Sequence, residues 1–179
     1  MLTRQFRNRR SLSIIALLAG VLAAGTAILL FHPGDRSAIP PKVVANDVSG
    51  RATACLATDT ATANKSDQVA KIWSAVQAAG AQSGKNVEQL IKPATDSGQA
   101  TPYLAGLVSQ RCDLIITIGP AFGQAVPTLA KADPAIRFTA VDSSLTTAPP
   151  GVTVAPTDQA VAFIQQQVQT VQRTGDPHS

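Results

Sequence analysis

The stretch CDLIITIG, residues 112–119, decides the fold class of this chain. Its centre, Leu114 to Ile118, is an uncharged run of four aliphatic residues and Thr117 that is rich in β-branched residues. Runs of this kind are typical of a strand that is buried on both faces of a parallel sheet. Gly119 and Pro120 then turn the chain at the end of the run. The stretch therefore predicts an interior strand of an α/β domain.

Short apolar runs alternate with segments of helical period on both sides of this strand. Alternating β and α elements imply right-handed crossovers and a doubly wound parallel sheet. The sequence thus predicts the α/β class, with one such sheet forming a single lobe. The predicted strands are 54–57, 87–91, 114–118 and 136–141, and the predicted helices cover 69–76, 102–108, 125–132 and 161–171.

The first 31 residues have the pattern of a membrane anchor. Four arginines, at positions 4, 7, 9 and 10, precede an uncharged apolar run from Leu12 to Phe31. About 20 apolar residues cross the roughly 30 Å hydrocarbon core, and positive residues stay in the cytoplasm. Cleavage within 23–27 is the alternative, but the apolar run continues past those small residues. We therefore expect a single-pass cell-membrane protein with a cytoplasmic N-terminus and an extracytoplasmic C-terminal domain. Thr26 stands where a lipobox would need cysteine, so we do not expect a lipid anchor.

These patterns divide the chain into five parts. The stretch after the apolar run contains several prolines and no apolar periodicity, which favours a semi-rigid stalk. About 130 residues remain outside the membrane, enough for one domain with a core. The predicted parts are a cytoplasmic tip (1–10), a transmembrane helix (11–31), a stalk (32–51), the α/β half domain (52–175) and a tail (176–179).

The charge balance argues against nucleic acid as a partner. The chain carries 15 Lys plus Arg and 11 Asp plus Glu, and four of the arginines lie in the first ten residues. The remaining 11 basic residues therefore equal the 11 acidic ones in number. Phosphate binding needs clustered basic residues without compensating acids, and no such cluster is present in the sequence after residue 10.

The sequence also lacks the common catalytic motifs, so we expect a protein that is not an enzyme and carries no cofactor. There is no Gly-x-Gly-x-x-Gly loop and no P-loop lysine, and Ser143 and Ser144 lack the glycines of a nucleophile elbow. The two histidines, His32 and His178, fall outside the predicted domain. Neither forms a metal-ligand spacing with the cysteines, and we predict no metal site.

The two cysteines are predicted to be buried thiols. Cys55 stands four residues before Asp59 and Cys112 stands seven before Gly119. If the two strand ends align, the cysteines are staggered by about 10 Å, which is too far for a disulfide. An oxidising compartment would permit a bridge, and this remains the alternative.

In doubly wound sheets the ligand crevice lies outside the carboxyl ends of the strands. The segments that follow strands here are 59–64, 119–124 and 142–145, and all three are rich in small or polar residues. The same residue types are also ordinary turn and N-cap residues. The sequence therefore leaves open whether these segments form a ligand rim or simply turn the chain.

Four motifs in order resemble the basic membrane protein family of substrate-binding proteins, which includes purine-nucleoside receptors of bacterial ABC importers. The resemblance implies a lobe like that of type I periplasmic binding proteins. In that family the Thr-Gly near Thr174 leads into a second lobe, whereas this sequence ends at Ser179, so we expect the first lobe alone. The motifs are TDTATANKSDQVAKIW (58–73), CDLIITIG (112–119), AVDSSL (140–145) and APPGVTVAPTDQAVAFIQQQVQTVQRTG (148–175).

The resemblance also suggests which residues contact a ligand. Two functions remain: binding a nucleoside-like solute for an ABC importer or sensor, or acting as a ligand-free interaction module at the membrane. Gln68 stands where the family usually has an aromatic residue, and Gln124 stands where the family often has an acidic one. Both differences favour the second function. Partners would be a solute, an ABC permease or a second copy of the chain. The candidate ligand-binding residues are Asp59, Asn64, Gly119, Gln124 and Asp142.

Overall fold

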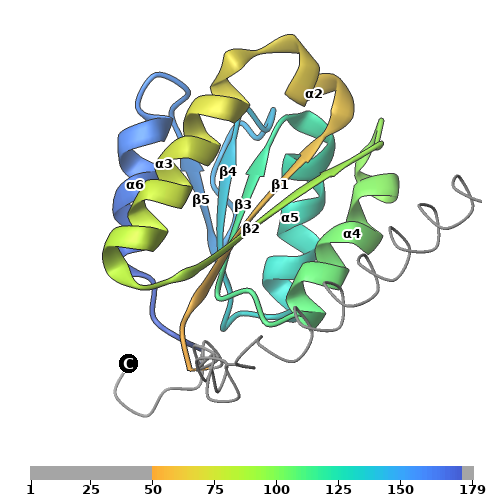
Figure 1. Cartoon of the computed structure of the whole chain (residues 1–179). Coiled ribbons are helices and arrows are strands. Elements are labelled where there is room, and N and C mark those ends of the chain that lie inside the picture. Colours follow the sequence, from red (N-terminus) through yellow and green to blue (C-terminus); the bar gives the residue numbers. More distant parts are fainter. Residues whose placement is uncertain (1–49, 175–179) are drawn as a thin grey trace, which may run out of the picture. The chain divides into compact units, whose positions relative to one another are not determined.

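The computed structural model describes residues 50–174 (Figure 1). The predicted tip, transmembrane helix and tail, with nearly all of the stalk, lie outside the described residues. Within residues 50–174, no helix combines the length and apolar character that a membrane crossing requires.

The described residues form one five-stranded parallel sheet in the order β2-β1-β3-β4-β5. The predicted α/β class and the parallel sheet are confirmed, as are all four predicted strands. The fifth strand was not predicted, because it is only four residues long and lies at the sheet edge. The strands are β1 (Thr53–Asp59), β2 (Asn86–Lys92), β3 (Leu114–Ile118), β4 (Arg137–Val141) and β5 (Val152–Ala155).

Helices cover both faces of the sheet. Figure 1 shows α3 and α6 on one face and α4 and α5 on the other. Polar side chains fix several helix starts, since the carboxylates of Asp59 and Asp96 and the hydroxyl of Ser66 accept backbone N–H groups in the first turns of α2, α4 and α3. The helices are α2 (Thr60–Lys65), α3 (Asp67–Ser83), α4 (Ser97–Ser109), α5 (Pro120–Ala132) and α6 (Ala160–Thr170).

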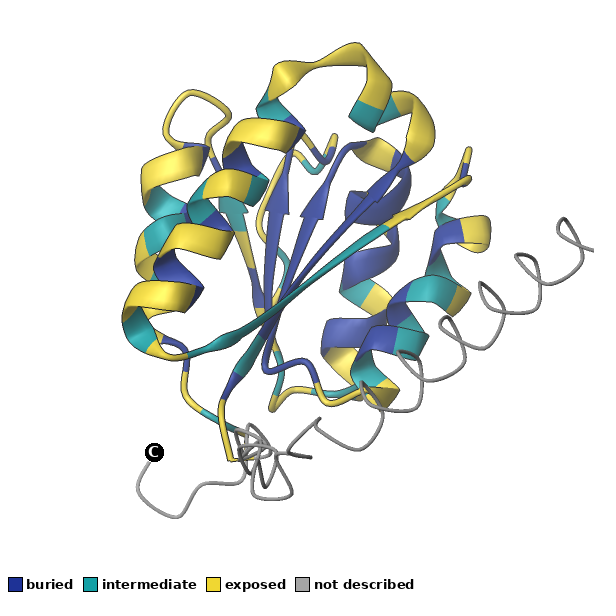
Figure 2. Cartoon of the chain, in the orientation of Figure 1, coloured by how far each residue is buried: buried dark blue, intermediate teal, exposed yellow. Residues whose placement is uncertain are grey.

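The core has two layers, one on each face of β3. All five residues of β3 are buried, as the dark central strands of Figure 2 show. Leu114, Ile116 and Ile118 pack in the layer beneath α3 and α6. Ile115 packs in the opposite layer, with Phe122 of α5. The alternation of side chains along one strand therefore joins both layers into a single domain.

Three helical predictions need correction. The segment after β1, expected to be a loop, is the short helix α2, because Asp59 caps it. Helix α4 begins at Ser97, five residues before Pro102, because the Asp96 carboxylate accepts the N–H of Gln99 at 2.9 Å. Helix α5 begins at Pro120 and not at residue 125, so nearly all of the segment 119–124, expected to be a loop, is helical.

The prediction of two free thiols is wrong, because Cys55 and Cys112 form a disulfide with Cα atoms 5.9 Å apart. The predicted register was right, since Cys55 lies opposite Ile115. The predicted separation of the two cysteines was too long, because it assumed that the strand continues in a straight line from Ile115 back to Cys112. Cys112 precedes β3, and the chain turns at Arg111, whose φ is 63°. The turn brings Cys112 back into the core layer that also contains Cys55.

Reduction of this disulfide should lower the free energy of unfolding by roughly 2–4 kcal/mol, because it releases a loop of 57 residues in the unfolded chain. Urea unfolding of residues 47–179 with and without reductant measures the difference. The double variant Cys55→Ala/Cys112→Ala is the control, and its stability should not respond to reductant. Equal unfolding midpoints for the oxidised and reduced wild type would contradict the prediction.

Candidate functional site

Asp59 ends β1 at the carboxyl edge of the sheet and is 4 % exposed. Its Oδ1 accepts the N–H of Thr62 at 2.8 Å, and its Oδ2 accepts the Thr62 hydroxyl at 2.6 Å. Both carboxylate oxygens therefore hold the first turn of α2 in place. Each carboxylate oxygen has more than one lone pair, so this arrangement leaves acceptor capacity at the edge.

Gly119 links the end of β3 to α5 and lies directly against Asp59. Its N–H donates to the carbonyl of Val141 at 3.0 Å, and its φ is 92°. A Cβ at this position would lie 2.6 Å from the Thr62 hydroxyl oxygen and 3.1 Å from Asp59 Oδ2. Only glycine permits this approach without strain. The close approach places the amino end of α5 beside the Asp59 carboxylate.

Helix α5 begins here without a side-chain cap, and Pro120 occupies its first turn. The first N–H groups of a helix have no partner within the helix, and the helix dipole is positive at this end. An uncapped start of a 13-residue helix at the carboxyl edge of the sheet therefore suits a hydroxyl, carbonyl or anionic oxygen.

The loop after β4 completes this edge. Asp142 and Ser144 both adopt left-handed backbone angles, with φ of 48° and 57°. Ser143 between them is buried, and a Cβ at Gly123 would lie 2.7 Å from its Cα. Gly123 thus lets the loop pack directly onto α5. Non-glycine residues in this region store backbone strain, which is common in loops that bind ligands.

The structure brings together some of the predicted site residues. Asp59 and Gly119 are in contact distance, and the loop of Asp142 packs on α5 through Ser143. Asn64 and Gln124 are exposed on α2 and α5, and no hydrogen bond among the described residues joins them to Asp59. Sequence reasoning gave no role to Ser143 or Gly123, because their pairing depends on how the loop folds against the helix.

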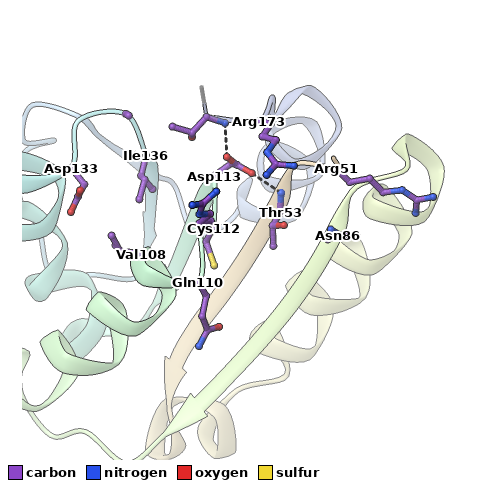
Figure 3. Close-up of a pocket in the computed structure, with 13 residues that line it drawn as sticks. Arg51, Thr53, Asn86, Val108, Gln110, Cys112, Asp113, Asp133, Ile136 and Arg173 are labelled. Carbon is purple, nitrogen blue, oxygen red and sulfur yellow. Dashed lines mark hydrogen bonds between the residues drawn. The ribbon is translucent and has the colours of Figure 1, made fainter. Parts of the chain in front are cut away.

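A cavity of about 520 Å³ opens at the opposite edge of the sheet, around the amino ends of the strands (Figure 3). Asp113, just before β3, is 5 % exposed and lines this cavity. Its Oδ2 accepts the N–H of Thr53 at 2.8 Å, and its Oδ1 accepts the N–H of Thr174 at 2.5 Å. One carboxylate therefore joins the start of β1 to the segment after α6. The sequence offered no sign of this role, since Asp113 reads as part of a strand motif.

Cys55, Cys112 and Glu88 place three metal-ligating atoms within 4.8 Å of one another. The disulfide uses both sulfur atoms, and a metal ligand must be a free thiolate. In this oxidised form the cluster is therefore a structural crosslink beside a carboxylate.

No protein-family model matches the chain, and no curated protein matches it either. Among solved structures, the chain is similar to a "putative lipoprotein" fragment from Peptoclostridium difficile 630, with 18% identity and a TM-score of 0.55. The match covers 66% of this chain and 96% of that chain, so the shared α/β fold makes up nearly all of that fragment. A transcriptional activator of the comK gene from Bacillus halodurans aligns at 17% identity with a TM-score of 0.45, over 57% of this chain and 33% of that chain. The first similarity shows the fold alone.

Replacing Gly119 by alanine should lower the free energy of unfolding by about 1–3 kcal/mol, because the new Cβ meets Thr62 and Asp59 at a left-handed φ. Gly106→Ala in α4 is the matched control, since nothing lies within 4 Å of its Cβ. The control should be neutral or stabilising by up to about 1 kcal/mol. Urea unfolding measures both, and equal stability of the two variants would rule out the close approach at Gly119.

Replacing Asp113 by alanine should cost about 1–3 kcal/mol, because the N–H groups of Thr53 and Thr174 lose their acceptor. The exposed Asp158 provides a control, and Asp158→Ala should change stability by less than about 0.5 kcal/mol. Amide hydrogen exchange at Thr53 should also become faster in the Asp113 variant alone. Unchanged exchange there would show that the carboxylate does not hold the start of β1.

Proposed function

We propose that this chain is a membrane-anchored, extracytoplasmic solute-binding domain related to the basic membrane protein family. The ligand is a nucleoside-like solute, bound at the carboxyl edge of the sheet for an ABC importer or a sensor, and the domain catalyses no reaction. The four ordered motifs and the arginine-led apolar run at the N-terminus support this proposal. The lipoprotein designation of the similar fragment agrees with an extracytoplasmic setting.

The observation that carries the proposal is the uncapped start of α5 at Gly119, beside Asp59 and the strained loop at Asp142. The helix start offers N–H donors to a carbonyl or hydroxyl oxygen. The exposed Asp142 carboxylate offers an acceptor for hydroxyl groups, as a ribose would require. Donors and acceptors therefore converge where a doubly wound sheet binds its ligand.

One lobe encloses only part of a ligand. Typical small-molecule sites bury about 70–90% of the ligand surface, which an open sheet edge does not provide. Binding to a single domain is therefore weak, and tight binding requires a second surface, such as another copy of the chain.

A ligand-free interaction module is the second candidate function, and Gln68 favours it. The Gln68 side chain donates to the carbonyl of Thr157 at 3.1 Å, and so links α3 to the segment after β5. The resemblance places an aromatic residue near this position, where it could stack on a base. The glutamine serves a structural contact instead, and Asp59 likewise uses both of its oxygens on Thr62.

A thermal-shift screen of residues 47–179 against nucleosides, bases and sugars separates the two functions. A ligand at about 100 times its dissociation constant adds roughly 2.7 kcal/mol of stability. We expect a saturable rise in melting temperature with nucleosides, which Asp142→Ala removes and Asp158→Ala leaves intact. If the folded domain shows no shift with any class, the interaction module is the function that remains.

A further inference from the structure

The exposed edge of β2 carries a charge pattern that matches itself. β2 bonds to β1 alone among the described strands, and none of its seven residues is buried. Its sequence, NVEQLIK, places Glu88 and Lys92 two residues on either side of Leu90. An antiparallel strand centred on Leu90 would therefore meet each charge with the opposite one.

The backbone directions of β2 fit this register. The N–H of Asn86 donates to the carbonyl of Ala52, towards β1. Because successive residues of a strand direct their backbone groups to opposite sides, Val87, Gln89 and Ile91 direct theirs to the outer edge. Pairing about Leu90 sets Gln89 opposite Ile91 of the second copy, and both residues then point N–H and C=O groups at the partner strand.

The side chains fit as well. In this register Glu88 lies opposite Lys92 of the second copy, and Leu90 lies opposite its own counterpart on the same face. Opposite charges that face each other across an antiparallel pair are stabilising, and like charges are not. Ile91, which is 42 % exposed, would gain cover from the partner strand. Centring the pair on Glu88 or on Lys92 instead would place like charges opposite each other.

We propose that two copies of this chain associate through antiparallel pairing of their β2 strands about Leu90, joining two five-stranded sheets into one ten-stranded sheet. Such an interface is isologous, because the same patch serves both copies. Exposed edges of sheets readily pair with further strands. The other edge suits pairing less well, since β5 has four residues and prolines at 149, 150 and 156 surround it. This proposal does not depend on the ligand proposed above.

Sedimentation velocity of the full chain in a mild detergent, without added ligand, tests the proposal. The wild type should show a monomer–dimer equilibrium. Lys92→Glu reverses an exposed charge and creates two like-charge pairs, so it should raise the dimer dissociation constant about tenfold or more. Glu88→Lys should do the same. Lys71→Glu, an equal charge change on the exposed face of α3, should leave the constant unchanged.

The decisive sample is a mixture of the Lys92→Glu and Glu88→Lys variants. In a dimer of either variant alone, residues 88 and 92 of the two copies carry like charges and face each other. In a mixed dimer, unlike charges face each other at both of these contacts. The mixture should dimerise as tightly as the wild type, and so should the double variant Glu88→Lys/Lys92→Glu. A monomeric wild type, or a dimer that Lys92→Glu weakens no more than Lys71→Glu does, would overturn the proposal. So would a mixture of folded single variants that stays monomeric.

Discussion

Strand β3 lies between β1 and β4 with all five of its side chains buried, and the positions of the other elements follow from that burial. Each face of the strand requires a helical layer, because apolar side chains project from both. Helices α3 and α6 cover Leu114, Ile116 and Ile118. Helices α4 and α5 cover Ile115, which packs in the same layer as Phe122. Parallel neighbours in turn require crossovers, which place every strand end at the same edge.

The two edges of the sheet differ in how the chain is held. At the amino edge, Asp113 bonds the start of β1 to the segment after α6, and the disulfide joins β1 to the turn before β3. These contacts fix the points where the chain enters and leaves the domain. At the carboxyl edge, Gly119 packs against Asp59 while the start of α5 stays uncapped. The amino edge is therefore crosslinked, whereas helix N–H groups at the carboxyl edge have no side-chain cap.

The position of β2 connects the fold to assembly. A parallel sheet leaves two edges open, and the order of strands makes the seven-residue β2 one of them. Its charges lie symmetrically about Leu90, so an antiparallel second copy would place each one opposite an unlike charge. The same pairing leaves the carboxyl edge accessible, because that edge lies at the ends of the strands and not along their sides.

The sequence by itself determined the class of the fold, the four longer strands and the alignment of the ends of β1 and β3, because an apolar run such as 114–118 depends on local composition. It also located Asp59 and Gly119 at one edge, since the strand ends of a parallel sheet coincide. Only the tertiary structure decided that Cys112 reaches Cys55, because the turn at Arg111 takes Cys112 off the line of β3. It also decided the roles of Asp113 and Ser143. Those roles depend on contacts between residues far apart in the chain, which no local pattern encodes.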